Sequence, residues 1–219
     1  MIAAMHFQFF DRTSEVYISY RRLPHWEQAG CTYFVTWRTE DTIPEPVLRR
    51  WKVERAVWLR KRGIDPQEPS WREQLRQLPR TDRFSYHEHF TRPWMERLDE
   101  CHGQCLLRRP ELAKIVADSL ASGNQTGYLL GDFVVMPNHV HVLVQLPTEG
   151  QLKPQCKSWK RWTARLINSA VEASGRFWQP ESFDTLVRSE AHFAPLRAYI
   201  GANPAAAGLQ VGEYHYYRA

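Results

Sequence analysis

Two histidines one residue apart are the clearest candidates for chemistry in this sequence. His139 and His141 lie at the start of residues 139–146, a stretch rich in β-branched side chains that predicts a strand. Side chains two positions apart in a strand point to the same face, so the two imidazoles would lie side by side. Neutral imidazole is a common ligand of divalent metal ions. The pattern therefore indicates either a metal site or two hydrogen-bonded histidines on a half-exposed sheet.

A second His-x-His pattern shows how little this spacing proves on its own. His87 and His89 flank Glu88 within residues 83–99, which we expect to be helical. Positions two apart on a helix diverge by roughly 200°, so their side chains do not converge on one ligand. We therefore expect no metal site at this second pair.

A tyrosine and an asparagine four residues apart form another candidate site. Tyr199 and Asn203 would stack on one face of the helix predicted over residues 192–202, with Asn203 at its very end because Pro204 follows. An amide oxygen is an acceptable third ligand for a hard divalent ion, and a phenol one turn away is a nucleophile. Taken alone, the pair favours the plainer interpretation, a helix stop beside a packing tyrosine.

The helix predicted over residues 152–173 is strongly basic. Its basic side chains between residues 151 and 170, where no acid occurs, are Lys153, Lys157, Lys160, Arg161 and Arg165. Lys157, Arg161 and Arg165 follow one another at four-residue steps and so form one stripe. Such a row repels itself unless an anion lies against it, and a DNA phosphate backbone is the simplest anion. A solvated basic face is the alternative, and the sequence does not separate the two.

The elements that must position these residues follow a simple order. After one strand come a helix, two strands, a helix, a strand and a helix, at residues 31–38, 110–120, 128–136, 139–146, 152–173, 183–188 and 192–202. This βαββαβ order predicts an α+β fold, a ferredoxin-like (RRM-like) antiparallel sheet with helices on one face. Residues 44–100 would form a helical insertion within a single domain spanning residues 1–219, because their own core would be thin.

Composition excludes several classes of protein. The chain has 219 residues, of which 43% are hydrophobic and 24% charged, so we expect a globular protein. No stretch approaches the roughly 20 apolar residues of a membrane helix, and the four cysteines form no zinc or disulfide pattern. With 29 Lys and Arg against 24 Asp and Glu, the net charge of +5 permits a nucleic-acid partner.

Several motifs together resemble the REP-associated tyrosine transposases, a branch of the HUH single-tyrosine, insertion-sequence-200-like transposases. The resembling stretches are residues 23–26, 30–36, 102–108 and 135–142, then Ser158-Trp159-Lys160, Trp178-Gln179, Phe183-Asp184, Tyr199-Ile200, Asn203-Pro204 and residues 207–209. They occur in the family's order and cover most of the chain.

The resemblance implies a function. His139 and His141 would hold Mg²⁺ or Mn²⁺, with Asn203 completing the site, and Tyr199 would attack a scissile phosphate in single-stranded DNA. A 5′-phosphotyrosine link would form, and the freed 3′-hydroxyl would later reverse the reaction on another DNA end. The partner would be single-stranded DNA with a palindromic hairpin, which Lys157, Lys160, Arg161 and Arg165 would help to bind.

Three other functions remain open from the sequence. The first is a DNA hairpin-binding protein that has lost cleavage, the second a metallohydrolase that acts on something other than DNA, and the third and weakest a structural or RNA-binding protein with a related sheet. The presence of the histidines, tyrosine and asparagine argues against the first, and the lack of a further acidic or histidine ligand nearby argues against the second. We expect a bacterial cytoplasmic protein, associated with the nucleoid when bound to DNA, and favour a monomer over a homodimer.

Overall fold

The computed structural model describes residues 6–20, 24–43, 45–91 and 101–219. The chain divides into two compact units. The core unit comprises Met1–Glu40 with Gln104–Ala219, and the helical unit comprises Asp41–Gly103. The helical unit has nearly the bounds expected for the insertion at residues 44–100; that both units make up one domain stays a prediction.

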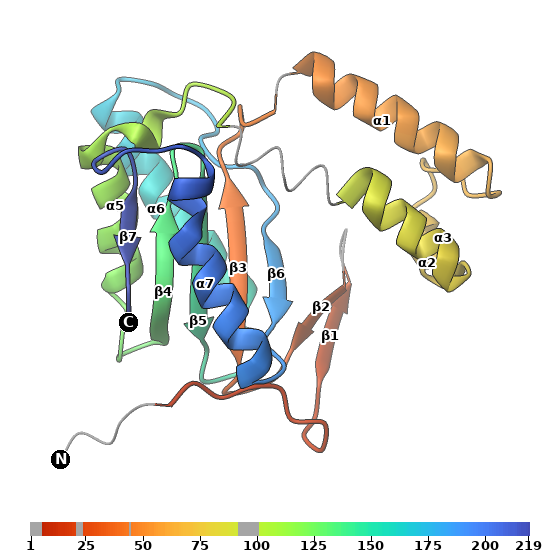
Figure 1. The fold of residues 1–219 in the computed structure, drawn as a ribbon, viewed down its shortest axis with the longest axis horizontal. Helices are drawn as coiled ribbons and strands as arrows, with labels where there is room; N and C mark the ends of the chain where they lie inside the picture. The colour runs from red at the N-terminus through yellow and green to blue at the C-terminus, as the bar shows by residue number, and fades with distance from the viewer. Residues whose placement is uncertain (1–5, 21–23, 44, 92–100) are drawn as a thin grey trace. The chain divides into compact units, whose positions relative to one another are not determined.

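An antiparallel sheet of five strands lies at the centre of the core unit (Figure 1). Its strands, in spatial order, are β6 (Phe183–Leu186), β3 (Thr32–Arg38), β5 (His139–Gln145), β4 (Leu129–Val135) and β7 (His215–Tyr217). All neighbouring strands run antiparallel. Apart from β7, these are the strands of the predicted βαββαβ order, so the α+β antiparallel fold is confirmed.

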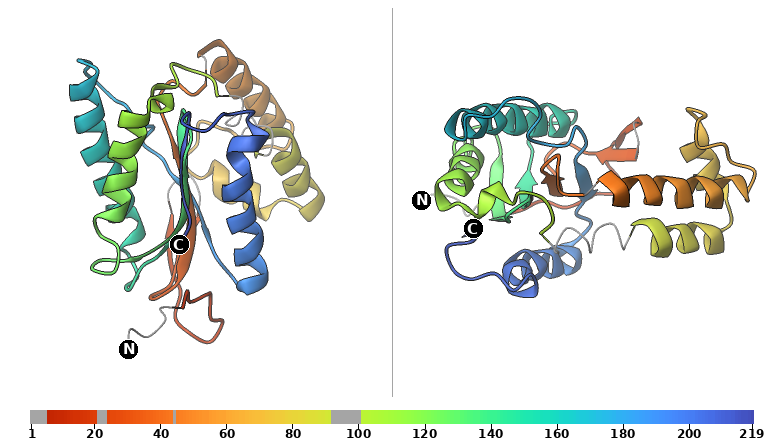
Figure 2. Two further views of the ribbon diagram at one scale, coloured as in Figure 1. Left: turned by 60° about the vertical axis from the view of Figure 1, so that its left-hand side comes forward. Right: turned by 90° about the horizontal axis from the view of Figure 1, so that it is seen from above.

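The three α-helices described in the core unit, which also has a short 3-10 helix, η2 (Leu106–Arg108), cover both faces of the sheet. They are α5 (Pro110–Ala121), α6 (Leu152–Ala170) and α7 (Glu190–Ala206). Helices α5 and α6 pack on one face, whereas α7 lies on the opposite face (Figure 2). The expectation that all helices share one face was wrong for α7, because the strands are apolar on both sides: Val142 faces α5 and α6, and Leu143 faces α7.

Buried tryptophans fill the core between the sheet and α6. Trp37 of β3 stacks on Trp159 of α6 with ring centroids 5.8 Å apart, and Trp178 meets Trp37 edge-on at 6.3 Å. The indole N–H groups of Trp159 and Trp178 each donate a hydrogen bond inside the core. Trp159 donates to the Tyr128 hydroxyl at 3.1 Å, and Trp178 donates to Thr163 Oγ1 at 2.9 Å. These rings therefore stabilise the fold and are not available for stacking on DNA bases.

The chain before β3 forms a hairpin that the sequence did not predict. Strands β1 (Tyr17–Tyr20) and β2 (Pro24–Glu27) pair with each other in a separate two-stranded sheet. Four-residue strands leave too short an alternation to be recognised by pattern. No helix among the described residues is long and apolar enough to span a membrane.

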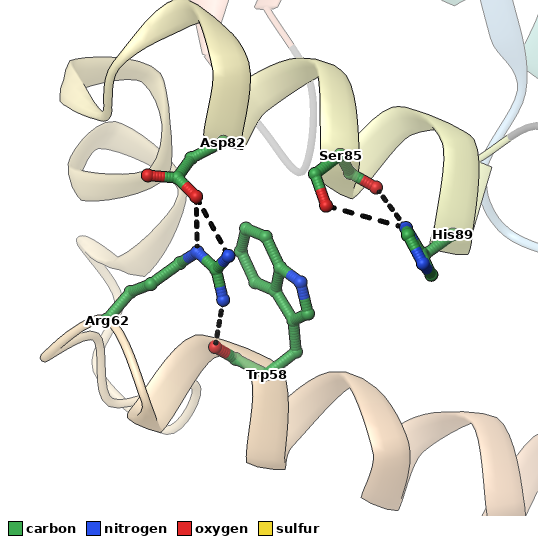
Figure 3. Close-up of polar contacts among 5 residues, drawn as sticks. All are labelled: Trp58, Arg62, Asp82, Ser85 and His89. Carbon is green, nitrogen blue, oxygen red and sulfur yellow. Dashed lines mark hydrogen bonds and ion pairs between the residues drawn. The ribbon is translucent and has the colours of Figure 1, made fainter.

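The helical unit contains α1 (Glu45–Arg60), α2 (Trp71–Gln77) and α3 (Arg80–Tyr86), which continues as a π-helical turn, η1 (His87–Thr91). The remainder of the helix expected over residues 83–99 lies outside the described residues. Arg62 lies 3.5 Å above the Trp58 ring and forms an ion pair of 2.8 Å with Asp82 (Figure 3). This contact joins the chain after α1 to α3.

Both histidines of the second His-x-His pattern lie in η1 of this unit, and the expectation that they hold no metal ion stays a prediction. His89 lies in η1, and its Nδ1 is 2.8 Å from the carbonyl oxygen of Ser85, so its imidazole is used within its own helix (Figure 3). Over the whole described part of the chain, no three His, Cys, Asp or Glu side chains are grouped closely enough to hold a metal ion.

Candidate active site

The two histidines of β5 lie together on the sheet face that α7 covers. His139 is fully buried and His141 is 2% exposed, and their ring centroids are 4.6 Å apart. Both therefore share one face, as their spacing predicted, but they are not on a half-exposed sheet. The cover that α7 provides accounts for their burial.

A hydrogen bond at Nδ1 fixes the orientation of each imidazole ring. His141 Nδ1 lies 2.7 Å from Oγ1 of Thr36, its cross-strand partner in β3, and His139 Nδ1 lies 2.7 Å from Asn138 Oδ1. An amide oxygen only accepts, so this bond puts the proton of His139 on Nδ1 and its lone pair on Nε2. Such outer hydrogen bonds are the usual support of metal-binding histidines.

Burial keeps both histidines neutral. It lowers the pKa of His139 to about 3; a hydrogen bond with the side chain of Asn203 opposes this, and the positive charge of Arg38 adds to it. Burial, and then His139, lower the pKa of His141 well below its usual value. The neutral ring is the form that binds a metal ion.

Helix α7 brings Tyr199 and Asn203 to these histidines. Asn203 is 1% exposed and reaches His139, as described above. The Tyr199 ring lies edge-on to His141 with centroids 5.2 Å apart, yet the residue is 40% exposed. The structure thus assembles the four predicted residues of the candidate site; their chemical roles stay predictions.

The expectation that Asn203 ends its helix was wrong, because α7 continues to Ala206. Pro204 lies in the last turn, where its missing N–H removes only one bond, to the carbonyl of Ile200. Ile200 is fully buried against the sheet and holds this turn in place. Packing therefore overrides the local preference of the residue that precedes a proline.

The side chains present fit a divalent cation. Nε2 of His141 is buried and has no hydrogen-bond partner among the described residues. Next to it are the second imidazole and the amide of Asn203, so the site offers two nitrogen donors and one oxygen donor of the types that divalent ions accept. The exposed Tyr199 beside them leaves an approach for substrate.

Sequence reasoning missed one charged residue at this site, Arg38. It is the cross-strand partner of His139, so the two side chains share the face that α7 covers. Burial lowers the pKa of its guanidinium to about 10, so the group stays charged at neutral pH. The alternation Thr36, Arg38 within the predicted strand would have indicated a shared face, but not which strand lies next to it.

The basic residues of α6 lie on the other face of the sheet. Lys157, Arg161 and Arg165 are exposed, and Arg165 stacks over Trp162 at 4.6 Å. Lys160 differs, because its Nζ donates to the carbonyl oxygens of Gln179, at 3.2 Å, and Pro180, at 2.8 Å. Lys160 therefore anchors the loop before β6 and is not part of the exposed stripe.

Comparisons with known proteins bear on this site. Residues 109–203 match the model of the family described as "Transposase IS200 like". A solved structure of a REP-associated tyrosine transposase bound to a REP hairpin is similar at 15% identity and a TM-score of 0.43, over 88% of this chain and 75% of that chain. No curated protein matches. The matched segment contains His139, His141, Tyr199 and Asn203, and it confirms that this chain resembles the IS200-like transposases.

Proposed function

We propose that this protein is a metal-dependent DNA strand transferase that cuts single-stranded DNA beside a hairpin and joins the ends. One observation carries the proposal. Within the segment that matches the IS200-like transposases, a buried pair of neutral histidines lies against a helix that presents an exposed tyrosine and a buried asparagine. Sequence motifs alone do not provide this spatial convergence.

The three ligand side chains would hold Mg²⁺ or Mn²⁺. His139 and His141 are kept neutral by burial, and Asn203 contributes an uncharged oxygen, so the site itself carries no negative charge against which a phosphate would be repelled. When bound, the ion supplies positive charge that polarises the scissile phosphate and favours the phenolate of a nearby tyrosine.

Tyr199 would act as the nucleophile, a role that its exposure beside His141 supports. Its Oη would form a bond to phosphorus while the bond from phosphorus to the 3′-oxygen breaks. The phenol proton is lost and the departing 3′-oxygen gains one, which leaves a 5′-phosphotyrosine and a free 3′-hydroxyl. One phosphodiester replaces another, so the 3′-hydroxyl of a second DNA end can reverse the step without an external energy source.

The proposed partner is single-stranded DNA that folds into a palindromic hairpin. The exposed stripe of Lys157, Arg161 and Arg165 supports phosphate binding on α6. A monomer acting in the bacterial cytoplasm, on the nucleoid when bound to DNA, completes the proposal.

Replacement of the nucleophile tests the proposed reaction. Incubation of the protein with a hairpin-bearing oligonucleotide and Mg²⁺ should give a covalent protein–DNA adduct, detected by mass spectrometry. Tyr199→Phe should give no adduct while hairpin affinity changes little, because only the phenol oxygen is lost. Tyr217→Phe, at an exposed tyrosine of β7, is the matched control and should react normally.

Three outcomes would contradict parts of this proposal. An adduct formed by Tyr199→Phe would remove Tyr199 from its role. Cleavage that survives a chelator would refute metal dependence. Tight hairpin binding by the unaltered protein without any adduct would show a binding protein that has lost cleavage.

A further inference from the structure

A β-bulge in β4 points an acidic side chain at helix α7. The register of β4 against β5 shifts between Leu130 and Phe133. Gly131 and Asp132 therefore lie together opposite one residue of β5, Leu143. A Cβ at Gly131 would lie only 2.9 Å from the Leu143 Cβ, so glycine fits this position. The extra residue keeps Leu130 and Phe133 in the core beneath α5 and α6 and turns Asp132 toward α7.

The Asp132 carboxylate is held by an arginine of α7. Asp132 is 2% exposed, and its Oδ1 accepts a hydrogen bond from Arg197 Nη2 at 2.7 Å. The same oxygen accepts from the backbone N–H of Ala219 at 3.1 Å, and the side chain of Tyr216 also hydrogen-bonds to the carboxylate. A buried carboxylate is costly unless opposite charge and hydrogen bonds satisfy it, and here Arg197 supplies the charge. The ion pair therefore ties α7 to β4 at one defined position.

Arg197 and Tyr199 reach opposite sides of the α7 axis. Residues two apart on a helix diverge by about 200°. The Tyr199 ring lies edge-on to His141 of β5 and to Phe34 of β3, with centroid distances of 5.2 and 6.1 Å. Arg197 instead reaches β4, which lies on the far side of β5 from β3. A contact at Arg197 therefore controls how α7 is rotated and, through that rotation, where the Tyr199 ring lies.

The backbone of α7 is weakened on both sides of Tyr199. Pro195 and Pro204 lie within the helix, and each lacks the N–H that would bond to the carbonyl four residues earlier. The turn that carries Tyr199 is thus joined to the helix ends by fewer hydrogen bonds than an ordinary helical turn, so side-chain contacts contribute more to its orientation. Ile200 packs this turn against the sheet, and the ion pair of Arg197 fixes the side nearest β4.

We propose that the Asp132–Arg197 ion pair sets the rotation of α7 and thereby positions the Tyr199 hydroxyl for attack. This inference rests on the proposed function and adds to it two positioning residues that act through Tyr199. Side chains of a helix extend about 5–6 Å from its axis, so a rotation of about 10° displaces them by about 1 Å. A misplacement of that size is enough to slow a reaction by up to about a hundredfold.

The rate of adduct formation tests the proposal. The protein is mixed with saturating hairpin oligonucleotide and Mg²⁺, and the covalent adduct is followed over time. Arg197→Gln should lower the first-order rate constant at least about tenfold, because α7 loses its anchor on β4. Hairpin affinity should change little, because the proposed hairpin-binding stripe lies on α6, on the other face of the sheet. Hydrogen exchange at the amides of β4 and β5 measures how much of the variant is folded.

A double variant removes the ion pair without leaving a buried charge. Asp132→Leu combined with Arg197→Met replaces the pair by apolar side chains, an exchange that is often neutral for stability. This double variant should stay folded and still react at least about tenfold more slowly than the unaltered protein. Arg197→Lys, which keeps the charge without the planar fork, should react at an intermediate rate. Asp118→Asn, which removes the carboxylate of an exposed ion pair on α5, is the matched control and should react at the full rate.

Two results would overturn the positioning role of this ion pair. One is a folded double variant that reacts at the full rate. The other is a rate for Arg197→Gln that falls only in proportion to its folded fraction, because the pair would then serve stability alone. If the unaltered protein forms no adduct, the proposed function itself is wrong and the positioning role falls with it.

Discussion

Acidification should destabilise the metal-free core unit through its buried histidines. The pKa of His139 is about 3 in the folded protein, against an ordinary value of 6.5 in the unfolded chain. Below pH 6.5 the unfolded chain therefore binds a proton that the folded protein excludes. The stability contributed by the neutral ring is fully present above pH 6.5 and is lost as the pH falls toward the folded pKa.

The expected loss is large enough to measure. A pH of 5.0 lies about 1.5 units below the pKa of His139 in the unfolded chain but still above its pKa in the folded protein. His139 alone should therefore lower the free energy of unfolding by about 2 kcal/mol at pH 5.0 relative to pH 7.5. His141, whose pKa burial also lowers, contributes in the same direction. The prediction changes little with the folded pKa as long as that pKa lies well below 5.

Hydrogen exchange at the amides of β3 and β5, with a chelator present and intrinsic rates corrected at each pH, isolates the core unit from the helical unit. Between pH 7.5 and 5.0, the free energy of unfolding of His139→Gln should fall by about 2 kcal/mol less than that of the unaltered protein. His87→Gln, which removes an exposed imidazole of the helical unit, is the control. Equal losses in the unaltered protein and in His139→Gln would refute the reasoning that burial excludes the proton.

Two further predictions follow from contacts on α6 and in the helical unit. Replacing Lys157, Arg161 and Arg165 by glutamine should reduce the log–log salt slope of hairpin binding by about 2, at roughly 0.7 per single-strand phosphate contact; an unchanged slope, measured by fluorescence anisotropy, would make the stripe a solvated face. Asp82→Asn should destabilise the helical unit by about 1 kcal/mol, because Arg62 loses a half-buried ion pair. Hydrogen exchange in α3 measures this effect. As a comparison, Lys114→Met breaks an exposed ion pair with Asp118 and should lower the free energy of unfolding by no more than about 0.5 kcal/mol.

The order along the chain of the longer strands and helices, without β1, β2 and β7, and the shared face of the two histidines could be predicted because they depend on local patterns. Alternation over β5 gives the shared face of His139 and His141, and the βαββαβ order follows from element types along the chain. The four-residue spacing of Tyr199 and Asn203 likewise gave their shared helix face.

Other features depend on contacts between distant segments, which a local pattern does not contain. The side on which α7 packs follows from the second apolar face of the sheet, to which Phe34 and Leu143 contribute. The position of Arg38 beside His139 depends on the register in which β3 pairs with β5, which the sequence pattern of either strand does not contain. Lys160 looked like its basic neighbours on α6, but the distant carbonyls of Gln179 and Pro180 bind it.

The place of α7 late in the chain also sets the order in which the candidate site is completed during synthesis. Residues of β3, β4 and β5 leave the ribosome first and can pair, which puts both histidines in place while Phe34 and Leu143 on the same face are still uncovered. Tyr199 and Asn203 arrive on the last helix of the sheet, and the same helix closes that apolar face. A nascent or truncated chain without this helix would therefore contain the two histidines but not Tyr199. Under the proposed function, the capacity to cut DNA would arise only together with the buried core that stabilises the finished protein.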